Sequence, residues 1–379
     1  MKKNPLSRFR GLEITMDNIR LDEFFLPPDF DTSTLSYEPV DYFKKYGFKV
    51  IKALSELYPR YNGIVSEKYI PTSIYYYYIM PYLVNMNLSM AYVDKNMYFQ
   101  HLPTVRQPET VVHNLHGRYF LPKLEKEITL ADAVRLLQGE ESVIIKPAIE
   151  SGAGRDVRLL RCREVSQCEC EEILKSYQSD FIVQRVLRQH AEMARLNPTS
   201  LNTCRVYTYR CVESGEYVVL GAAVRFGGKG AHRDNACAGG GFCRINPDGS
   251  VADAIYHYRS FENGSLKALK GIEHFKIPNY DGVIETCLSS HRRIPYMDLI
   301  GWDIAIAEDG VPALVELNQY PDCEMLQIVN GPMFGEHTDA LMERISKHHL
   351  KDVVVYKRSF DDLPHTCDYN FEIGKAYTI

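Results

Sequence analysis

The run GWDIAIAEDGVPALVELNQYPD, residues 301–322, predicts a β-hairpin. Its centre, Asp309-Gly310, is a dipeptide that favours a two-residue type I′ turn. Counting outward from that turn gives the pairs Ala307–Pro312 and Asp303–Glu316. The sequence therefore predicts two carboxylates that face each other on neighbouring strands.

Side chains alternate along a strand, so Glu316 and Asn318 share one face while Val315 and Leu317 point the other way, into apolar surroundings. Asp303 lies on the Glu316 face, where directly opposed Cβ atoms are about 5 Å apart. Two carboxylates this close favour a cation between them. Carboxylate and amide oxygens suit Mg²⁺, which completes its shell with waters and phosphates. The alternative is an ordinary exposed hairpin with an acidic outer face.

Composition is that of a soluble globular protein. The chain has 379 residues, of which 45% are hydrophobic and 25% charged, which is enough for two or three lobes. A net charge of −5 gives no global basic field for nucleic acid or anionic membranes. Residues 70–90 are apolar but hold two prolines and several tyrosines, so we expect no membrane span there. The N-terminus lacks an apolar signal segment, and ten irregularly spaced cysteines fit reduced thiols in the cytoplasm.

A lysine and a glycine-rich segment lie upstream of the hairpin. Thr129 is the expected cap of a helix over residues 130–138. Residues 142–146 and 157–160 are predicted strands, with Lys146 ending the first and glycines between them. Gly152 and Gly154 allow backbone N–H groups to approach anionic oxygens. This is no Walker loop, because Lys146 precedes the glycines. The glycines could equally form only a turn.

Farther along, residues 181–184 form a predicted short strand, followed by a hairpin over residues 202–225 that carries Arg205 and Arg225. The planar guanidinium binds phosphate oxygens bidentately, although a surface ion pair is the alternative for Arg225. Asp281 is the expected cap of a helix over residues 282–292.

The order of these motifs resembles the ATP-grasp superfamily. Asp303, Glu316 and Asn318 are similar to its metal-ligand pattern, and Lys146 with the glycine segment is similar to its small nucleotide lobe. The motifs Gln189-His190, Asn197-Pro198, Asp234-Asn235 and Gly239-Gly240-Gly241 are similar to the sugar-transfer-associated ATP-grasp proteins.

The resemblance implies roles for individual residues. Lys146, Gly152 and Gly154 are implied to contact the phosphates of ATP, and Lys95 is implied to be part of the nucleotide-binding site. Gln184 and the backbone near Val186 are implied to contact adenine, with Gln189 or His190 near the ribose. Arg205, Arg225 and Asn235 are implied at the γ-phosphate and acceptor, and Asp303, Glu316 and Asn318 at one or two Mg²⁺ ions. A surface lysine is the alternative for Lys95, and a structural histidine the alternative for His190. Tyr320, Pro321, Asp322 and Gln327 are expected at the acceptor end of the cleft.

We therefore predict an α+β protein with the ATP-grasp fold, in which two lobes with mainly antiparallel sheets grip ATP. The expected parts are an N-terminal region (1–100), a small nucleotide lobe (101–186), a large lobe with the metal site (187–350) and a C-terminal tail (351–379).

The implied activity is a cytoplasmic ATP-dependent carboxylate–amine ligase acting through an acyl phosphate on small-molecule substrates. From the resemblance, the carboxylate is expected on a sugar such as a uronic acid, or on an amino acid, in polysaccharide or cell-surface biosynthesis. A kinase on the same fold, a peptide or amino-acid ligase making a small natural product, and a nucleotide-binding scaffold are the alternatives. The oligomeric state is open.

Overall fold

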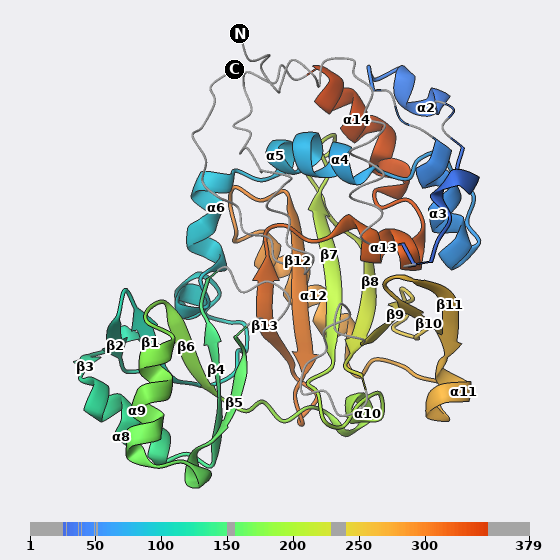
Figure 1. Ribbon diagram of the computed structural model, residues 1–379. Helices are drawn as coiled ribbons and strands as arrows, with labels where there is room; N and C mark the ends of the chain where they lie inside the picture. The colour runs from blue at the N-terminus through green and yellow to red at the C-terminus, as the bar shows by residue number, and fades with distance from the viewer. Residues whose placement is uncertain are drawn as a thin grey trace.

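The computed structural model describes residues 26–347, apart from residues 28, 37, 39, 49, 51, 150–155 and 229–239. Within them, helices pack against two antiparallel sheets that lie side by side (Figure 1). The predicted α+β class is therefore confirmed. None of the helices in this part of the chain is long and apolar enough to cross a membrane.

The smaller sheet has six strands in the order β3-β2-β1-β6-β4-β5. The strands are β1 (Thr110–Leu115), β2 (Arg118–Phe120), β3 (Glu127–Ile128), β4 (Ser142–Pro147), β5 (Arg158–Arg161) and β6 (Phe181–Arg185). Helices α8 (Leu130–Gln138) and α9 (Gln167–Ser176) pack on it. Thr129 caps α8 as predicted, since its hydroxyl accepts the Asp132 backbone N–H at 3.1 Å. Val134, Leu137 and Ile145 form part of the separate core of this sheet and its helices.

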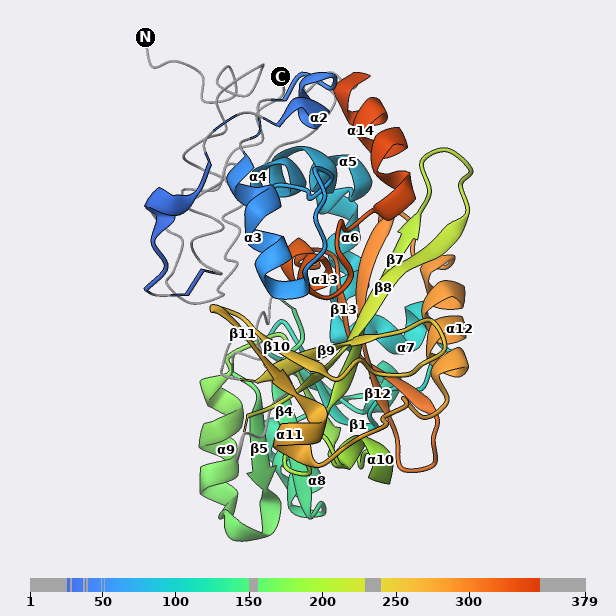
Figure 2. The same ribbon diagram turned by 90° about the vertical axis from the view of Figure 1, so that its right-hand side faces the viewer.

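The larger sheet has seven strands in the order β11-β10-β9-β8-β7-β12-β13. They are β7 (Thr203–Arg210), β8 (Tyr217–Phe226), β9 (Gly241–Ile245), β10 (Ala254–His257), β11 (Ser260–Ser265), β12 (Leu299–Ile306) and β13 (Pro312–Asn318). Helix α12 (Tyr280–His291) packs on one face and α13 (Cys323–Asn330) on the other (Figure 2). The short helix α10 (Ala191–Ala194) lies beyond the lower ends of its strands in Figure 1, and α11 (Leu266–Lys270) packs against β11.

The predicted cap of α12 is wrong by two residues. Asn279, with a left-handed backbone (φ 50°), precedes the helix, and Asp281 lies inside its first turn. A carboxylate in the first turn still interacts favourably with the helix dipole.

The N-terminal residues form short helices that pack beside the larger sheet, where α3 contacts α13 and α6 contacts β13. They are α2 (Asp41–Lys44), α3 (Lys52–Asn62), α4 (Thr72–Ile74), the π-helical turn η3 (Tyr75–Ile79), α5 (Met80–Leu83), α6 (Met86–Val93), η4 (Lys95–Met97) and α7 (Tyr98–His101). Tyr75 is buried and donates its hydroxyl to the Pro321 carbonyl at 2.5 Å. Helix α14 (Thr338–Lys347) completes this end of the molecule. The Tyr-rich segment is therefore part of the main core.

Candidate functional site

The hairpin of β12 and β13 brings Asp303 and Glu316 opposite each other, as predicted. The path to that pairing differs from the prediction. Ile306, not Ala307, pairs with Pro312, and a bulge between Asp303 and Ile304 shifts the register back by one residue. Because of the bulge, Val315 is paired with no residue of β12. Val315 lines the cavity described below instead of facing the core.

The predicted type I′ turn is wrong. Gly310 alone has a left-handed backbone (φ 80°), whereas type I′ needs positive φ at both central residues. The Gly310 N–H donates to the Ala307 carbonyl at 2.8 Å, and the Ala307 N–H donates to Val311 at 3.0 Å. The loop therefore has three residues instead of the predicted two, and the bulge compensates for this extra residue.

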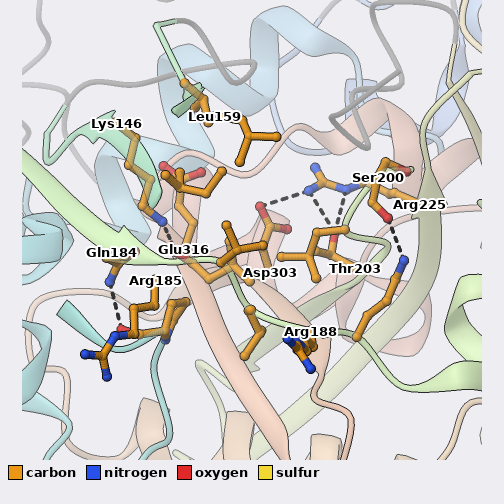
Figure 3. A pocket seen from close by; sticks show the side chains of 18 of the residues that line it. Lys146, Leu159, Gln184, Arg185, Arg188, Ser200, Thr203, Arg225, Asp303 and Glu316 are labelled. Atoms are coloured by element: carbon orange, nitrogen blue, oxygen red, sulfur yellow. Dashed lines mark hydrogen bonds and ion pairs between the residues drawn. The ribbon is translucent and has the colours of Figure 1, made fainter. Parts of the chain in front are cut away.

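Asp303 is clamped by two arginines from neighbouring strands. Arg205, directly opposite it on β7, donates from Nε at 2.6 Å and from Nη2 at 3.1 Å. Arg225 of β8 lies 3.1 Å away and also donates to Thr203 (Figure 3). Burial alone raises the pKa of Asp303, but the two guanidinium charges outweigh burial and hold that pKa below its usual value. The carboxylate is 4% exposed and ionised.

Two lysines approach Glu316 from the other side. Lys95 Nζ lies 2.8 Å from a Glu316 carboxylate oxygen, and the Lys95 side chain is 4% exposed. The Lys95 backbone N–H also donates to Ala148, just after the strand that carries Lys146. Lys146 Nζ donates to the Val315 carbonyl at 3.3 Å. Burial, with a smaller contribution from the Lys95 charge, lowers the pKa of Lys146 to about 8.

These contacts revise the sequence argument for a metal. The opposed carboxylates already have protein cations beside them, because Arg205 and Arg225 pair with Asp303 and Lys95 pairs with Glu316. The surface alternative for Lys95 is wrong, since its side chain is buried. Opposed carboxylates therefore do not by themselves require a divalent ion.

The donor set nevertheless fits Mg²⁺. Asn318 uses its amide N–H₂ toward the Gly301 carbonyl and Asp303, each at 3.3 Å, and within the described residues its Oδ1 has no hydrogen-bond partner. Two carboxylates and one free amide oxygen are hard ligands, and Mg²⁺ in such sites takes its other ligands from water and phosphate. The described residues hold no group of three or more His, Cys, Asp or Glu that would make an all-protein metal cage.

A cavity of about 410 Å³ lies between the two sheets, above this cluster. Ten of the residues predicted for the site line it, namely Lys95, Lys146, Gln184, Val186, Gln189, Arg205, Arg225, Asp303, Glu316 and Asn318. Apolar residues of β4, β5 and the segment after β6 also line it, including Ile144, Leu159 and Leu187, and Arg185 and Arg188 line it as well. The cavity lining thus combines apolar side chains with paired charges.

The stretch of sequence that contains the cavity residues matches a known protein family. Residues 91–341, more than half of the chain, match the model of the sugar-transfer associated ATP-grasp family. The chain belongs to the ATP-grasp family. The matched residues contain both sheets and the cavity, and the predicted ATP-grasp fold is confirmed. No curated protein sequence matches the chain.

Solved structures of other ATP-grasp and related enzymes are similar at low identity. The ATP-grasp ligase PsnB complexed with minimal precursor has 16% identity and a TM-score of 0.39, with 68% of this chain and 63% of PsnB covered. The D-cycloserine synthetase DcsG has 13% identity and a TM-score of 0.41, with 69% and 73% covered. The L-amino acid ligase from Bacillus licheniformis has 12% identity and a TM-score of 0.35, with 70% and 48% covered. The chain thus spans less than two thirds of the length of PsnB.

Two residues assigned to ribose by the resemblance are engaged elsewhere. Gln189 donates to the Asn197 and Ser200 carbonyls at 3.1 and 2.7 Å and accepts from the backbone and side-chain N–H groups of Asn202, so both ends of its amide hold the loop before β7. His190 accepts the Glu192 N–H on Nδ1 at 3.1 Å and is not among the residues that line the cavity. Gln189 nevertheless lines the cavity, and the ribose contact of Gln189 or His190 stays a prediction.

Gln184 is buried and donates to the Pro108 carbonyl at 3.1 Å. Gln327 was expected at the acceptor end, but it is fully buried and bonds to both backbone groups of Ile70. The expectation for Gln327 is therefore wrong, because the N-terminal residues cover it. Gly152, Gly154 and Asn235 lie outside the described residues.

Sequence reasoning gave no role to several residues of the cavity. Arg188, Ser200 and Thr203 line it (Figure 3). Strand alternation from Arg205 would have found Thr203. The others come from loops, whose course no periodicity in the sequence predicts.

Proposed function

We propose that the protein is an ATP-dependent carboxylate–amine ligase, with ATP bound between the lobe of residues 101–186 and the lobe of residues 187–350. The observation that carries the proposal is a cavity lined both by Lys95, Lys146, Arg205 and Arg225 and by apolar side chains. Apolar walls suit a base, and converging cations suit a triphosphate.

In the proposed reaction, a substrate carboxylate oxygen attacks the γ-phosphorus of ATP, the bond to the bridging oxygen breaks, and ADP leaves. An amine nitrogen then attacks the acyl carbon of the acyl phosphate. Inorganic phosphate leaves with the carbon–oxygen bond electrons, the amine releases a proton to solvent, and an amide remains. Phosphoryl transfer of this kind needs positioning and charge neutralisation more than a protein nucleophile.

The residues divide this work between them. Lys95 and Lys146 hold the phosphates, and Arg205 and Arg225 face the charge that develops on the transferred group. Asp303, Glu316 and the Asn318 Oδ1 would hold one or two Mg²⁺ ions, which supply further neutralisation of phosphate charge. Val186 also lines the cavity, and its backbone would contact the base.

For the substrates, we propose a sugar carboxylate such as a uronic acid, or an amino acid, joined to an amine in polysaccharide or other cell-surface biosynthesis in the cytoplasm. The family description, sugar-transfer associated, supports the sugar. A peptide or amino-acid ligase that makes a small natural product is the second candidate.

Hydroxylamine trapping tests the reaction type. With Mg-ATP and a turned-over carboxylate, an acyl phosphate gives a hydroxamate, whereas a kinase that phosphorylates a hydroxyl gives none. Glu316→Gln should abolish hydroxamate formation while the thermal unfolding temperature stays within a few degrees of wild type. Asp309→Asn, an exposed change in the turn of the same hairpin, is the matched control and should retain full activity. Full activity of the Glu316 variant would remove that residue from the site.

A further inference from the structure

Asp322 joins three separate elements to the candidate active site. Its Oδ1 accepts from Arg205 Nη1 at 3.1 Å and from the Tyr207 hydroxyl at 3.2 Å. Its Oδ2 accepts from the Tyr258 hydroxyl at 2.6 Å and from the Met325 backbone N–H at 3.2 Å. The donors come from β7, from the turn after β10 and from α13. A helix cap alone needs only the Met325 contact.

Arg205 therefore lies between two carboxylates. Its Nε and Nη2 donate to Asp303, and its Nη1 donates to Asp322. The Arg205 side chain is 8% exposed. A guanidinium taken so far out of water needs a carboxylate partner in every state of the protein, because an uncompensated buried charge is strongly destabilising.

The chain is shaped to bring Asp322 to this place. Gly301 lies on β12 beneath Pro321, and a Cβ at position 301 would lie 2.7 Å from the Pro321 Cβ and 3.6 Å from the Arg205 Cδ. Only glycine lets the segment before α13 cross so close over the strand. On the far side, the Tyr258 ring packs 5.1 Å from the Phe242 ring, which fixes the hydroxyl that Asp322 accepts.

We propose that Asp322 is a positioning residue for Arg205, and this rests on the proposed function. If Asp303 bound Mg²⁺, Arg205 would give up part of its pairing with Asp303. Asp322 would then remain as the counter-charge and hold Nη1, so that the Nε and Nη2 edge would stay beside Asp303 with its donors available to phosphate. Without Asp322, Asp303 would be the one carboxylate partner of Arg205 among the described residues, and Arg205 would compete with the metal for it.

The test is the Mg²⁺ dependence of nucleotide binding, followed with a fluorescent ATP analogue in the absence of any second substrate. For Asp322→Asn we expect the metal-free affinity for the analogue to stay within about threefold of wild type. The Mg²⁺ concentration for half-maximal enhancement of binding should rise about tenfold or more, in line with loss of one charged hydrogen bond. Asp309→Asn, which also removes a carboxylate that pairs with an arginine, is the control and should leave both values unchanged.

A second variant covers the case in which Asp322→Asn does not fold. Tyr207→Phe with Tyr258→Phe keeps the Asp322 charge but removes two of the hydroxyls that hold it, and the Mg²⁺ requirement should rise about threefold. Wild-type Mg²⁺ dependence in a folded Asp322→Asn protein, or in the double variant if that one must be used, overturns the positioning role. Wild-type protein that binds no nucleotide overturns the proposed function, and the positioning role with it.

Discussion

Replacing Lys95 by Met should weaken binding of Mg-ATP strongly while the fold persists. A surface role was the alternative for Lys95, but its Nζ lies 2.8 Å from Glu316 and its side chain is 4% exposed. Met has a similar length and no charge, so it fills the same space without leaving a buried cation unpaired. Glu316 is 27% exposed and can turn toward water.

The magnitude follows from the contact that the phosphates lose. Hydrogen bonds to charged groups contribute about 1.5–3 kcal/mol net, and a site shielded from water lies at the upper part of that range. About 2–3 kcal/mol corresponds to a roughly 30- to 150-fold rise in the dissociation constant. The unfolding temperature should change by only a few degrees, because the lost ion pair is partly offset by relief of lysine burial.

The assay is titration of the protein with a fluorescent ATP analogue and Mg²⁺, with thermal unfolding measured in parallel. Lys267→Met is a matched control, because Lys267 also lies 2.8 Å from a carboxylate, that of Glu273, but both side chains are more than half exposed. It should bind the analogue as wild type does. Binding by the Lys95 variant within threefold of wild type, or an equal loss in the control, would refute the assignment of Lys95 to the phosphates.

Three further changes have defined outcomes. The pKa of Lys146 is about 8, and bound phosphate raises it, so nucleotide binding takes up a proton above pH 8. The dissociation constant of the nucleotide should therefore rise up to about tenfold per pH unit from about pH 8 to 9.5. Lys146→Arg should remove this pH dependence, and a dependence that persists in the variant would show that it does not arise from Lys146. Gln189→Ala should lower the free energy of unfolding by about 2–4 kcal/mol in urea titrations, because buried groups of Asn202 and of the loop before β7 lose their hydrogen-bond partner. The exposed control Gln167→Ala should have the unfolding free energy of wild type. Gly301→Ala should cost about 1–3 kcal/mol by displacing Pro321 and should lower turnover; a variant with wild-type stability would show that the crossing over β12 has room for a methyl group.

The hairpin illustrates how much of the site the sequence predicts. The pairing of Asp303 with Glu316 was predicted and is confirmed, although two local errors cancel on the way to it. The sequence favoured a two-residue turn, and nothing in a run of apolar residues marks Val315 as the bulge that compensates the longer loop. The register of a hairpin depends on both the loop length and any bulge. Here the two one-residue shifts cancel, so the pairing is as predicted only beyond the bulge, at Asp303 and Glu316.

Contacts between distant segments were the least predictable. The motif that contains Lys95 precedes Glu316 by 221 positions, and its burial depends on η4 docking against β13. Asp322 was expected near the acceptor, but its hydrogen bonds to Tyr258 and Arg205 arise from three elements whose packing no local pattern encodes. Gln189 was assigned to ribose by resemblance, while its hydrogen bonds hold the neighbouring loop. The roles of Gly152, Gly154 and Asn235 stay predictions.

The central claim is that ATP drives formation of an amide, and product analysis tests it most directly. The protein is incubated with Mg-ATP, pooled uronic acids and pooled amino acids, and ADP, free phosphate and new masses are followed together. The proposed function predicts ADP and phosphate in equal amounts with a new mass equal to carboxylate plus amine minus water. ADP without free phosphate, together with a phosphorylated product, would contradict the ligase and establish a kinase on the same fold.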